Sequence, residues 1–176
     1  MSKVISFIRL GDMDPDLFRR VAEETGTLLG CSVNIMPARP LDQEGYEPRK
    51  KQYSSLRLLE SVRLFVEKGV PVIALVGADL SYPGLNFVFG LADGLNRLAV
   101  VSTARFAAGS QASRDRTIDR AVKTALHEAG HLLGLQHCKD QRCVMVLSFV
   151  LSDTDFKRKN FCDTCRKKMD VAWLKQ

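Results

Sequence analysis

The chain has 176 residues, of which 45% are apolar and 26% charged, and its formal net charge is +6. This length and composition indicate a globular protein with a core of its own. They argue against wholesale disorder, and a chain of this length needs no disulfide scaffold to fold. No apolar run approaches the ~20 residues of a transmembrane helix, and Arg9 interrupts the N-terminal apolar segment, so neither a membrane partner nor a secretory signal is expected.

The chain predicts strands that alternate with helices over its first hundred residues. Strands are expected where apolar and β-branched residues cluster, at residues 3–10, 31–36, 70–77, 86–92 and 98–102. Helices are expected at residues 14–30, 54–69, 117–133 and 165–174. Residues 37–51 are expected to form a loop, residues 82–84 a turn, and residues 110–117 a polar lead into the third helix. The alternation favours a partly parallel sheet covered by helices.

All three histidines lie in one short segment, residues 127–137, which reads HEAGHLLGLQH. His127 and His131 are four residues apart, so on a helix they stand on one face and can bind the same metal ion. Gly134 allows the chain to leave the helix, and the turn can bring His137 back as a third ligand. Three neutral nitrogens leave the fourth position of a zinc ion open for water, which is the arrangement of a catalytic site.

Glu128 follows the first of these histidines and is the expected catalytic residue. Zinc lowers the pKa of a bound water, the carboxylate accepts the proton, and the hydroxide attacks a polarised carbonyl. The alternative is that the histidines are ordinary residues of an amphipathic helix. At about 100° per residue, however, they lie opposite the apolar face of that helix. We therefore expect the helix to bury its apolar face against the sheet and to point its histidines away from that core.

The cysteines form a second group with metal-ligand spacing. Cys138 and Cys143 make a Cys-x4-Cys pair, and Cys162 and Cys165 make a Cys-x2-Cys pair, which together predict a closed structural zinc site. Two disulfides or a redox Cys-x-x-Cys are the alternatives, and the absence of a secretory signal weakens both. Cys31 is left over and is expected to be a buried thiol rather than a metal-blocking cysteine. Two zinc ions are thus expected, one catalytic and one structural.

The histidine segment resembles the motif of the metzincin clan of zinc peptidases, in which a methionine follows the third histidine in a Met-turn. Met145, eight residues after His137, is the candidate for that methionine. Some metzincins carry a tyrosine two residues later, where this chain has Leu147, so assistance from a tyrosine is not expected there. The cysteine that directly follows the third histidine, the Cys-x4-Cys-x-Met pattern and the late Phe-Cys-x-x-Cys make the chain similar to the archaemetzincins in particular. Segments 52–53 and 85–92 also resemble that family.

The resemblance implies an α/β (α+β) fold, with a metzincin-like twisted mixed β-sheet, packed helices, a long active-site helix and a small C-terminal subdomain stapled by zinc. Residues 1–137 would form the subdomain with the sheet and the active-site helix, and residues 138–176 the one with the Met-turn and the four cysteines. The resemblance also implies a cytoplasmic metallopeptidase that acts on peptide or protein substrates. The substrate is expected to lie extended beside residues 86–92, as along the rim strand of a metzincin.

Two other functions fit the sequence less well. A zinc-stabilised binding or scaffold protein with little or no peptidase turnover would have no use for the carboxylate of Glu128. Nucleic-acid binding through the cysteine pairs would require strongly salt-dependent affinity. The basic clusters at residues 49–51, 157–159 and 166–168 lack interleaved aromatic residues and are expected to be solvated faces, so a nucleic-acid partner is not expected.

Overall fold

The computed structural model describes residues 3–66, 69–107 and 113–174. The expected end of the second helix at Lys68 and the first part of the polar lead, residues 110–112, lie outside these ranges. The elements are β1 (Val4–Leu10), α1 (Pro15–Leu29), β2 (Ser32–Ile35), a 3₁₀ turn η1 (Gln43–Gly45), β3 (Tyr46–Glu47), β4 (Gln52–Ser54), α2 (Ser55–Arg63), β5 (Val72–Val76), β6 (Leu80–Tyr82), β7 (Leu85–Val88), β8 (Gly90–Asp93), β9 (Leu98–Ser102), α3 (Arg114–Leu132), α4 (Leu151–Phe156) and α5 (Asp163–Leu174).

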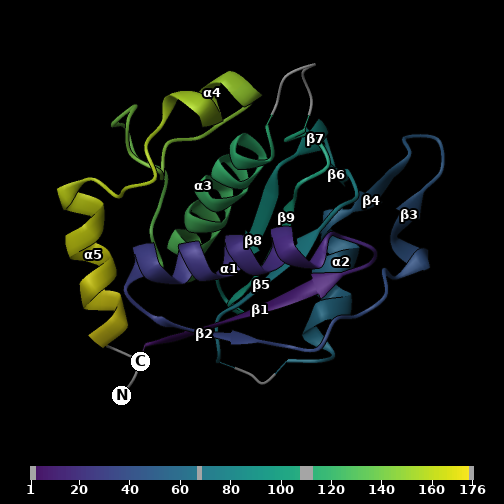
Figure 1. Cartoon of the computed structure of the whole chain (residues 1–176), viewed down its shortest axis with the longest axis horizontal. Coiled ribbons are helices and arrows are strands. Elements are labelled where there is room, and N and C mark those ends of the chain that lie inside the picture. The colour runs from purple at the N-terminus through teal and green to yellow at the C-terminus, as the bar shows by residue number, and fades with distance from the viewer. Residues whose placement is uncertain (1–2, 67–68, 108–112, 175–176) are drawn as a thin grey trace.

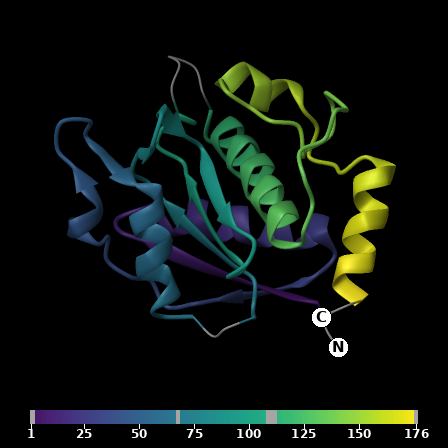
Figure 2. The same ribbon diagram turned by 180° about the vertical axis from the view of Figure 1, so that it is seen from behind.

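A five-stranded mixed sheet in the order β2-β1-β5-β9-β8 forms the centre of the molecule (Figures 1 and 2). The first four strands are parallel, and β8 pairs antiparallel with β9 at the edge. Every residue of β5 is buried, because its alternate side chains enter two cores. Ile73 and Leu75 pack in the core under α1 and α3, whereas Val72 and Ala74 pack in the core under α2. The expected mixed α/β architecture is therefore confirmed.

A second sheet, in the order β3-β4-β6-β7, extends one end of the first. It corrects two expectations, because residues 37–51 contain η1 and β3 rather than a plain loop, and residues 86–92 are not one strand. They are divided between β7 in the small sheet and β8 in the large sheet. Phe89 lies between the two strands, and its ring packs 5.4 Å from that of Phe106, which anchors the change of direction.

The second helix is shorter than the sequence predicts. Ser54 caps it as expected, since its hydroxyl accepts a hydrogen bond from the backbone N of Arg57, but α2 ends at Arg63. The next apolar side chain, Leu64, is exposed and has no core to pack against. Without tertiary packing, apolar periodicity alone does not extend a helix.

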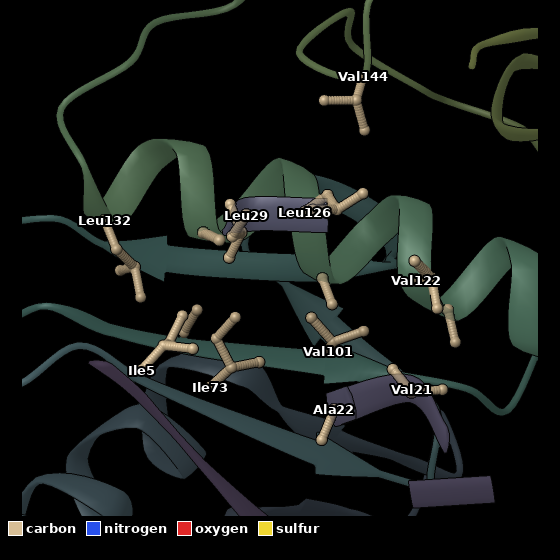
Figure 3. Close-up of a cluster of buried hydrophobic side chains, with 14 of the residues drawn as sticks. Ile5, Val21, Ala22, Leu29, Ile73, Val101, Val122, Leu126, Leu132 and Val144 are labelled. Atoms are coloured by element: carbon tan, nitrogen blue, oxygen red, sulfur yellow. The ribbon is translucent and has the colours of Figure 1, made fainter. Parts of the chain in front are cut away.

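Helix α3 lies between the large sheet and the C-terminal segment. Figure 3 shows Val122 and Leu132 pointing from the helix towards the sheet, while Val144 lies on the opposite side of the helix. The face that carries the histidines does point away from the sheet, as expected. It is nevertheless buried at Arg120 and Thr124, because residues 143–157 cover it.

Helix α4 was not expected from the sequence. The carboxylate of Asp153 accepts hydrogen bonds from the backbone N atoms of Phe149 (2.8 Å) and Val150 (3.1 Å) and thereby caps the helix. Its six residues are too few to show an amphipathic period. Within the described ranges, no helix is both long and apolar enough to cross a membrane.

Candidate metal centre and active site

The three histidines meet at the C-terminal end of α3. His127 and His131 stand one turn apart on the helix, which ends at Leu132. Gly134 then takes a left-handed conformation with φ = +80°, which favours glycine. The backbone N of Leu135 donates to the carbonyl of Gly130 at 2.9 Å and closes the turn. As the spacing predicts, the turn returns His137, and one ring nitrogen of each histidine lies within 4.8 Å of those of the other two.

Backbone carbonyls fix the orientation of the two helical imidazoles. Nδ1 of His127 donates to the carbonyl of Val144 at 2.9 Å, and Nδ1 of His131 donates to that of Leu135 at 2.8 Å. Each ring therefore presents the lone pair of Nε2, and these two Nε2 atoms lie 3.1 Å apart. Two facing lone pairs at this distance repel each other unless a cation lies between them. The arrangement fits zinc, which is usually bound by imidazoles whose other nitrogen donates to an oxygen.

The electrostatic environment keeps these rings neutral. Burial, together with the nearby Lys157 ammonium, lowers the pKa of His127 well below its ordinary value. Burial also lowers the pKa of His131. Both imidazoles are thus unprotonated at neutral pH, as metal ligands must be.

Glu128 is 5% exposed and lies beside β8. Gly90 makes this contact possible, because a Cβ at that position would lie 2.6 Å from Oε1 of Glu128. Burial raises the pKa of Glu128 to about 8, and the charge of Lys157 opposes the rise. With this pKa, the carboxyl group can gain or lose a proton near neutral pH.

A cavity of about 580 Å³ opens over the histidines and Glu128. Residues 85–92 of β7 and β8 form one wall, and residues 147–149 with Thr154 and Lys157 form another. Leu147, the residue at the position where some metzincins carry tyrosine, lines this cavity. A cavity of this size accommodates several residues of an extended peptide.

Met145 is fully buried and packs against the helix between the two histidines. A Cβ at Gly130 would collide with Sδ of Met145, so glycine is needed there for the close approach. The carbonyl of Met145 accepts a hydrogen bond from the backbone N of Cys138 at 3.0 Å. The methionine therefore supports the turn that carries His137 as well as the helix.

The structure also brings the four cysteines of the C-terminal segment together. Their sulfur atoms all lie within 4.8 Å of one another, and no pair forms a disulfide. The backbone N atoms of Met145 and Cys162 point at Sγ of Cys143 from 3.5 and 3.3 Å. Burial opposes ionisation of Cys162, but hydrogen bonds from neighbouring groups hold its pKa below the ordinary value. Burial instead raises the pKa values of Cys143 and Cys165. The convergence of four sulfur atoms fits a closed zinc site, in which the metal holds the ligands as thiolates.

Cys31 lies outside both groups. It is half-buried rather than fully buried as expected, and it packs against the core under α1 and α3. Burial raises its pKa to about 11, so its thiol is protonated and unreactive at neutral pH.

Lys157 corrects an expectation from the sequence. The basic cluster 157–159 was expected to be solvated, but the side chain of Lys157 is 3% exposed and lines the cavity together with Thr154 and Thr124. Nothing in the local sequence distinguishes Lys157 from its basic neighbours. Lys157 is buried because α4 packs against α3. The hydrogen bond from Arg120 to Asp155 shows this contact, which joins residues 35 positions apart in the sequence.

Comparisons with known proteins agree with this geometry. Peptidase family M54 matches residues 50–171. Archaemetzincin of Natronomonas pharaonis is 30% identical over 171 residues, which cover 94% of this chain and 98% of that protein. The crystal structure of archaemetzincin from Methanopyrus kandleri matches with a TM-score of 0.86 at 33% identity, over 99% of this chain and 97% of that one. A zinc-dependent peptidase from Methanocorpusculum labreanum matches with a TM-score of 0.85 at 29% identity, over 93% of this chain and 99% of that one.

Proposed function

The chain belongs to peptidase family M54 and is a zinc-dependent metallopeptidase, and we propose that it works with a zinc ion held by His127, His131 and His137 and with Glu128 as general base. The observation that carries the assignment is the convergence of the three histidine nitrogens beside a buried carboxylate. A structural metal site has no need of that carboxylate. The substrates of this metallopeptidase are peptides or proteins.

When bound, zinc supplies a Lewis acid that lowers the pKa of water and polarises the scissile carbonyl. Glu128 accepts a proton from the attacking water at its carboxylate and passes it to the leaving amine. Its burial in the cavity wall keeps bulk water from competing for that proton. Lys157 adds positive charge to the cavity and favours the ionised form of Glu128.

The substrate is expected to lie along the edge strand β8. Beyond β8 the large sheet has no further strand within the described residues, so the outer backbone groups of β8 are available to pair with an extended peptide. Residues 90–92 of β8 are the part of the expected rim that lies beside Glu128 and α3. β7 lines the continuation of the cavity from the small sheet.

The four cysteines are proposed to hold a second, structural zinc ion, which gives two ions per chain. Residues 138–176 would then be a subdomain pinned by that ion, beside a subdomain of residues 1–137. A cytoplasmic, reducing location keeps such thiols available to metal. Elemental analysis of the purified protein should find two zinc ions, and chelators should remove the ion of the open histidine site first. A reproducible content of one zinc ion per chain would refute one of the two proposed sites.

The general-base role is tested with Glu128→Ala. The variant should keep its zinc and its fold, because Glu128 is not a proposed ligand, while hydrolysis falls by about 10²–10⁴-fold or more. Cleavage products of a peptide library, compared between the parent protein and this variant, measure the difference. His127→Ala should lose the catalytic metal together with activity. Equal turnover by Glu128→Ala on a substrate whose cleavage requires zinc would refute the role, and a parent protein without any turnover would favour a zinc-stabilised scaffold.

A further inference from the structure

One wall of the cavity carries a buried cation that makes no ion pair within 4.0 Å in the described part of the chain. The side chain of Lys157 is 3% exposed, and its only hydrogen bond within the described residues goes from Nζ to the carbonyl of Val146 at a long 3.4 Å. None of the salt bridges of the described residues includes it, so no carboxylate oxygen lies within 4.0 Å of Nζ. An ammonium group has three donors. Burying an ammonium group that makes only one weak hydrogen bond costs free energy.

Two hydroxyl groups on the same wall also lack partners. Thr154 is 1% exposed, and Oγ1 of Thr154 and Oγ of Ser148 are buried without a hydrogen bond to any described residue. Both residues line the cavity together with Lys157. Buried hydroxyls normally find a partner, so these two groups and the ammonium offer hydrogen bonds to a molecule that enters the cavity.

This wall is fixed in place before any substrate binds. Asp155, between Thr154 and Lys157, accepts two hydrogen bonds from the Arg120 guanidinium, each of 2.7 Å. Arg120 also donates to the carbonyl of Phe106 at 2.7 Å, and Lys123 donates to that of Asp155 at 3.3 Å. The buried face of α3 thus holds α4 and the residue after it. Donors that are already ordered lose little entropy when they bind a ligand.

The charges around the cavity define what the wall can accept. Lys157 is the only basic and Glu128 the only acidic side chain among the residues that line it in the described part of the chain, the histidines aside. Burial is the largest influence on Lys157 and lowers its pKa to about 8, although the charge of Glu128 favours the ammonium form. Glu128 is committed to the water, so an additional anion has to come from outside the protein.

We propose that Lys157, Thr154 and Ser148 form a subsite that binds a carboxylate of the substrate. The inference rests on the proposed function, because it assigns a substrate class to that same site. A cationic side chain would be repelled by the ammonium, and a neutral one could accept its hydrogen bonds but would not balance its charge. The carboxylate has two sources, an Asp or Glu side chain near the scissile bond or the free C-terminus of a short peptide.

Binding without turnover gives the clearest test. Zinc-loaded Glu128→Gln protein would be titrated with fluorescein-labelled alanine hexapeptides that carry Glu, Gln or Lys at one position, each as free acid and as C-terminal amide. We expect at least about 30-fold tighter binding of the carboxylate than of its amide counterpart, as for buried charge pairs. A loss on Glu→Gln replacement identifies the side chain, and a loss on amidation identifies the C-terminus.

Variants of the residues in this wall then show which side chain causes the carboxylate preference. Lys157→Met in the same background should reduce it to within about 3-fold, and Lys157→Glu should favour the Lys peptide. Arg158→Met removes a positive charge from the exposed neighbouring residue and should change nothing. If the Lys157 variants fail to fold, Thr154→Val serves instead, and it should lower the preference by about 3–10-fold.

Two outcomes would overturn the subsite, namely no carboxylate preference in the parent background or a preference that survives Lys157→Met. The proposed peptidase activity fails separately. An inert protein that still selects carboxylates through Lys157 keeps the subsite and loses the activity, whereas an active protein without that selection keeps the activity and loses the subsite.

Discussion

The carbonyl of Val144 holds the imidazole of His127 through a 2.9 Å hydrogen bond to Nδ1, so the C-terminal segment orients a side chain of helix α3. The residues on either side of Val144 have other partners. Cys143 belongs to the four-cysteine group, and Met145 packs against Gly130 of α3. Three consecutive residues therefore link the cysteine group to the histidine group.

This link predicts that loss of the cysteine site weakens the histidine site. Cys165→Ser should release the proposed structural zinc and loosen residues 138–176 in hydrogen exchange. It should also reduce the zinc affinity of the histidines by about 10–100-fold, as for the loss of an outer hydrogen-bond partner. Competition with a chromophoric chelator measures the affinity. Cys31→Ser, which changes a cysteine outside both groups, is the control. Unchanged affinity in a variant that has lost its second zinc would disprove the link.

Gly90 is predicted to be essential for the position of Glu128. In Gly90→Ala the new Cβ would lie 2.6 Å from Oε1 of Glu128, so the carboxylate has to move from its present place in the cavity. We expect kcat to fall by about 10-fold or more while zinc content is unchanged, since a shift of about 1 Å is costly in an active site. At Gly77 a Cβ would meet its nearest atom at an ordinary 3.7 Å, which makes Gly77→Ala the matched control. Wild-type kcat in Gly90→Ala would show that the carboxylate tolerates the displacement.

Gly130 and Met145 are predicted to be energetically coupled. Gly130→Ala should cost about 1–3 kcal/mol of unfolding free energy through overpacking against Sδ. Met145→Ala should cost about 2–5 kcal/mol through the cavity that it leaves. Because the new methyl group occupies part of that cavity, the double variant should lose less than the sum of the two. Urea unfolding of all four proteins gives the coupling, and strict additivity would contradict the contact.

The Arg120–Asp155 pair is predicted to stabilise the protein in a pH-dependent manner. The hydrogen bonds from Arg120 are the largest of the influences that hold the pKa of Asp155 below its ordinary value of 3.8. A depressed pKa contributes stability that is complete above the unfolded-state value and is lost as the pH falls through the lower folded-state value. Asp155→Asn should therefore cost about 1–3 kcal/mol at pH 7, a figure that allows for the partial exposure of Asp155.

The unfolding free energies of the parent and Asp155→Asn should converge as the pH falls below 3.8. Denaturant titrations at a series of pH values measure this convergence. Asp12→Asn removes an equal charge from an exposed position and should not reproduce it. A difference that stays constant with pH would mean that the carboxylate charge contributes nothing.

The sequence predicted those parts of the fold and site that depend on local spacing. The four-residue interval of His127 and His131 places them on one helical face, and the Gly134 turn is encoded at the position where the helix has to stop. Burial of Lys157 could not be read in this way. It depends on the packing of α4 against α3. This contact joins segments that are distant in the sequence, and it produces no recognisable spacing of apolar residues in either segment. Phe89 shows the same limit, because only the packing of its ring reveals that residues 86–92 change sheets.

The division of residues 85–93 into two strands also bears on self-association. A long, flat strand with a free edge recruits the same strand of another molecule and starts aggregation. Here the edge beside the cavity is offered by two strands of four residues, β7 and β8, which belong to different sheets. A second copy of the chain finds too short a register on either strand, whereas a flexible peptide can follow the bend at Phe89. We therefore expect the bend to make the edge pair more readily with unfolded chains than with folded ones.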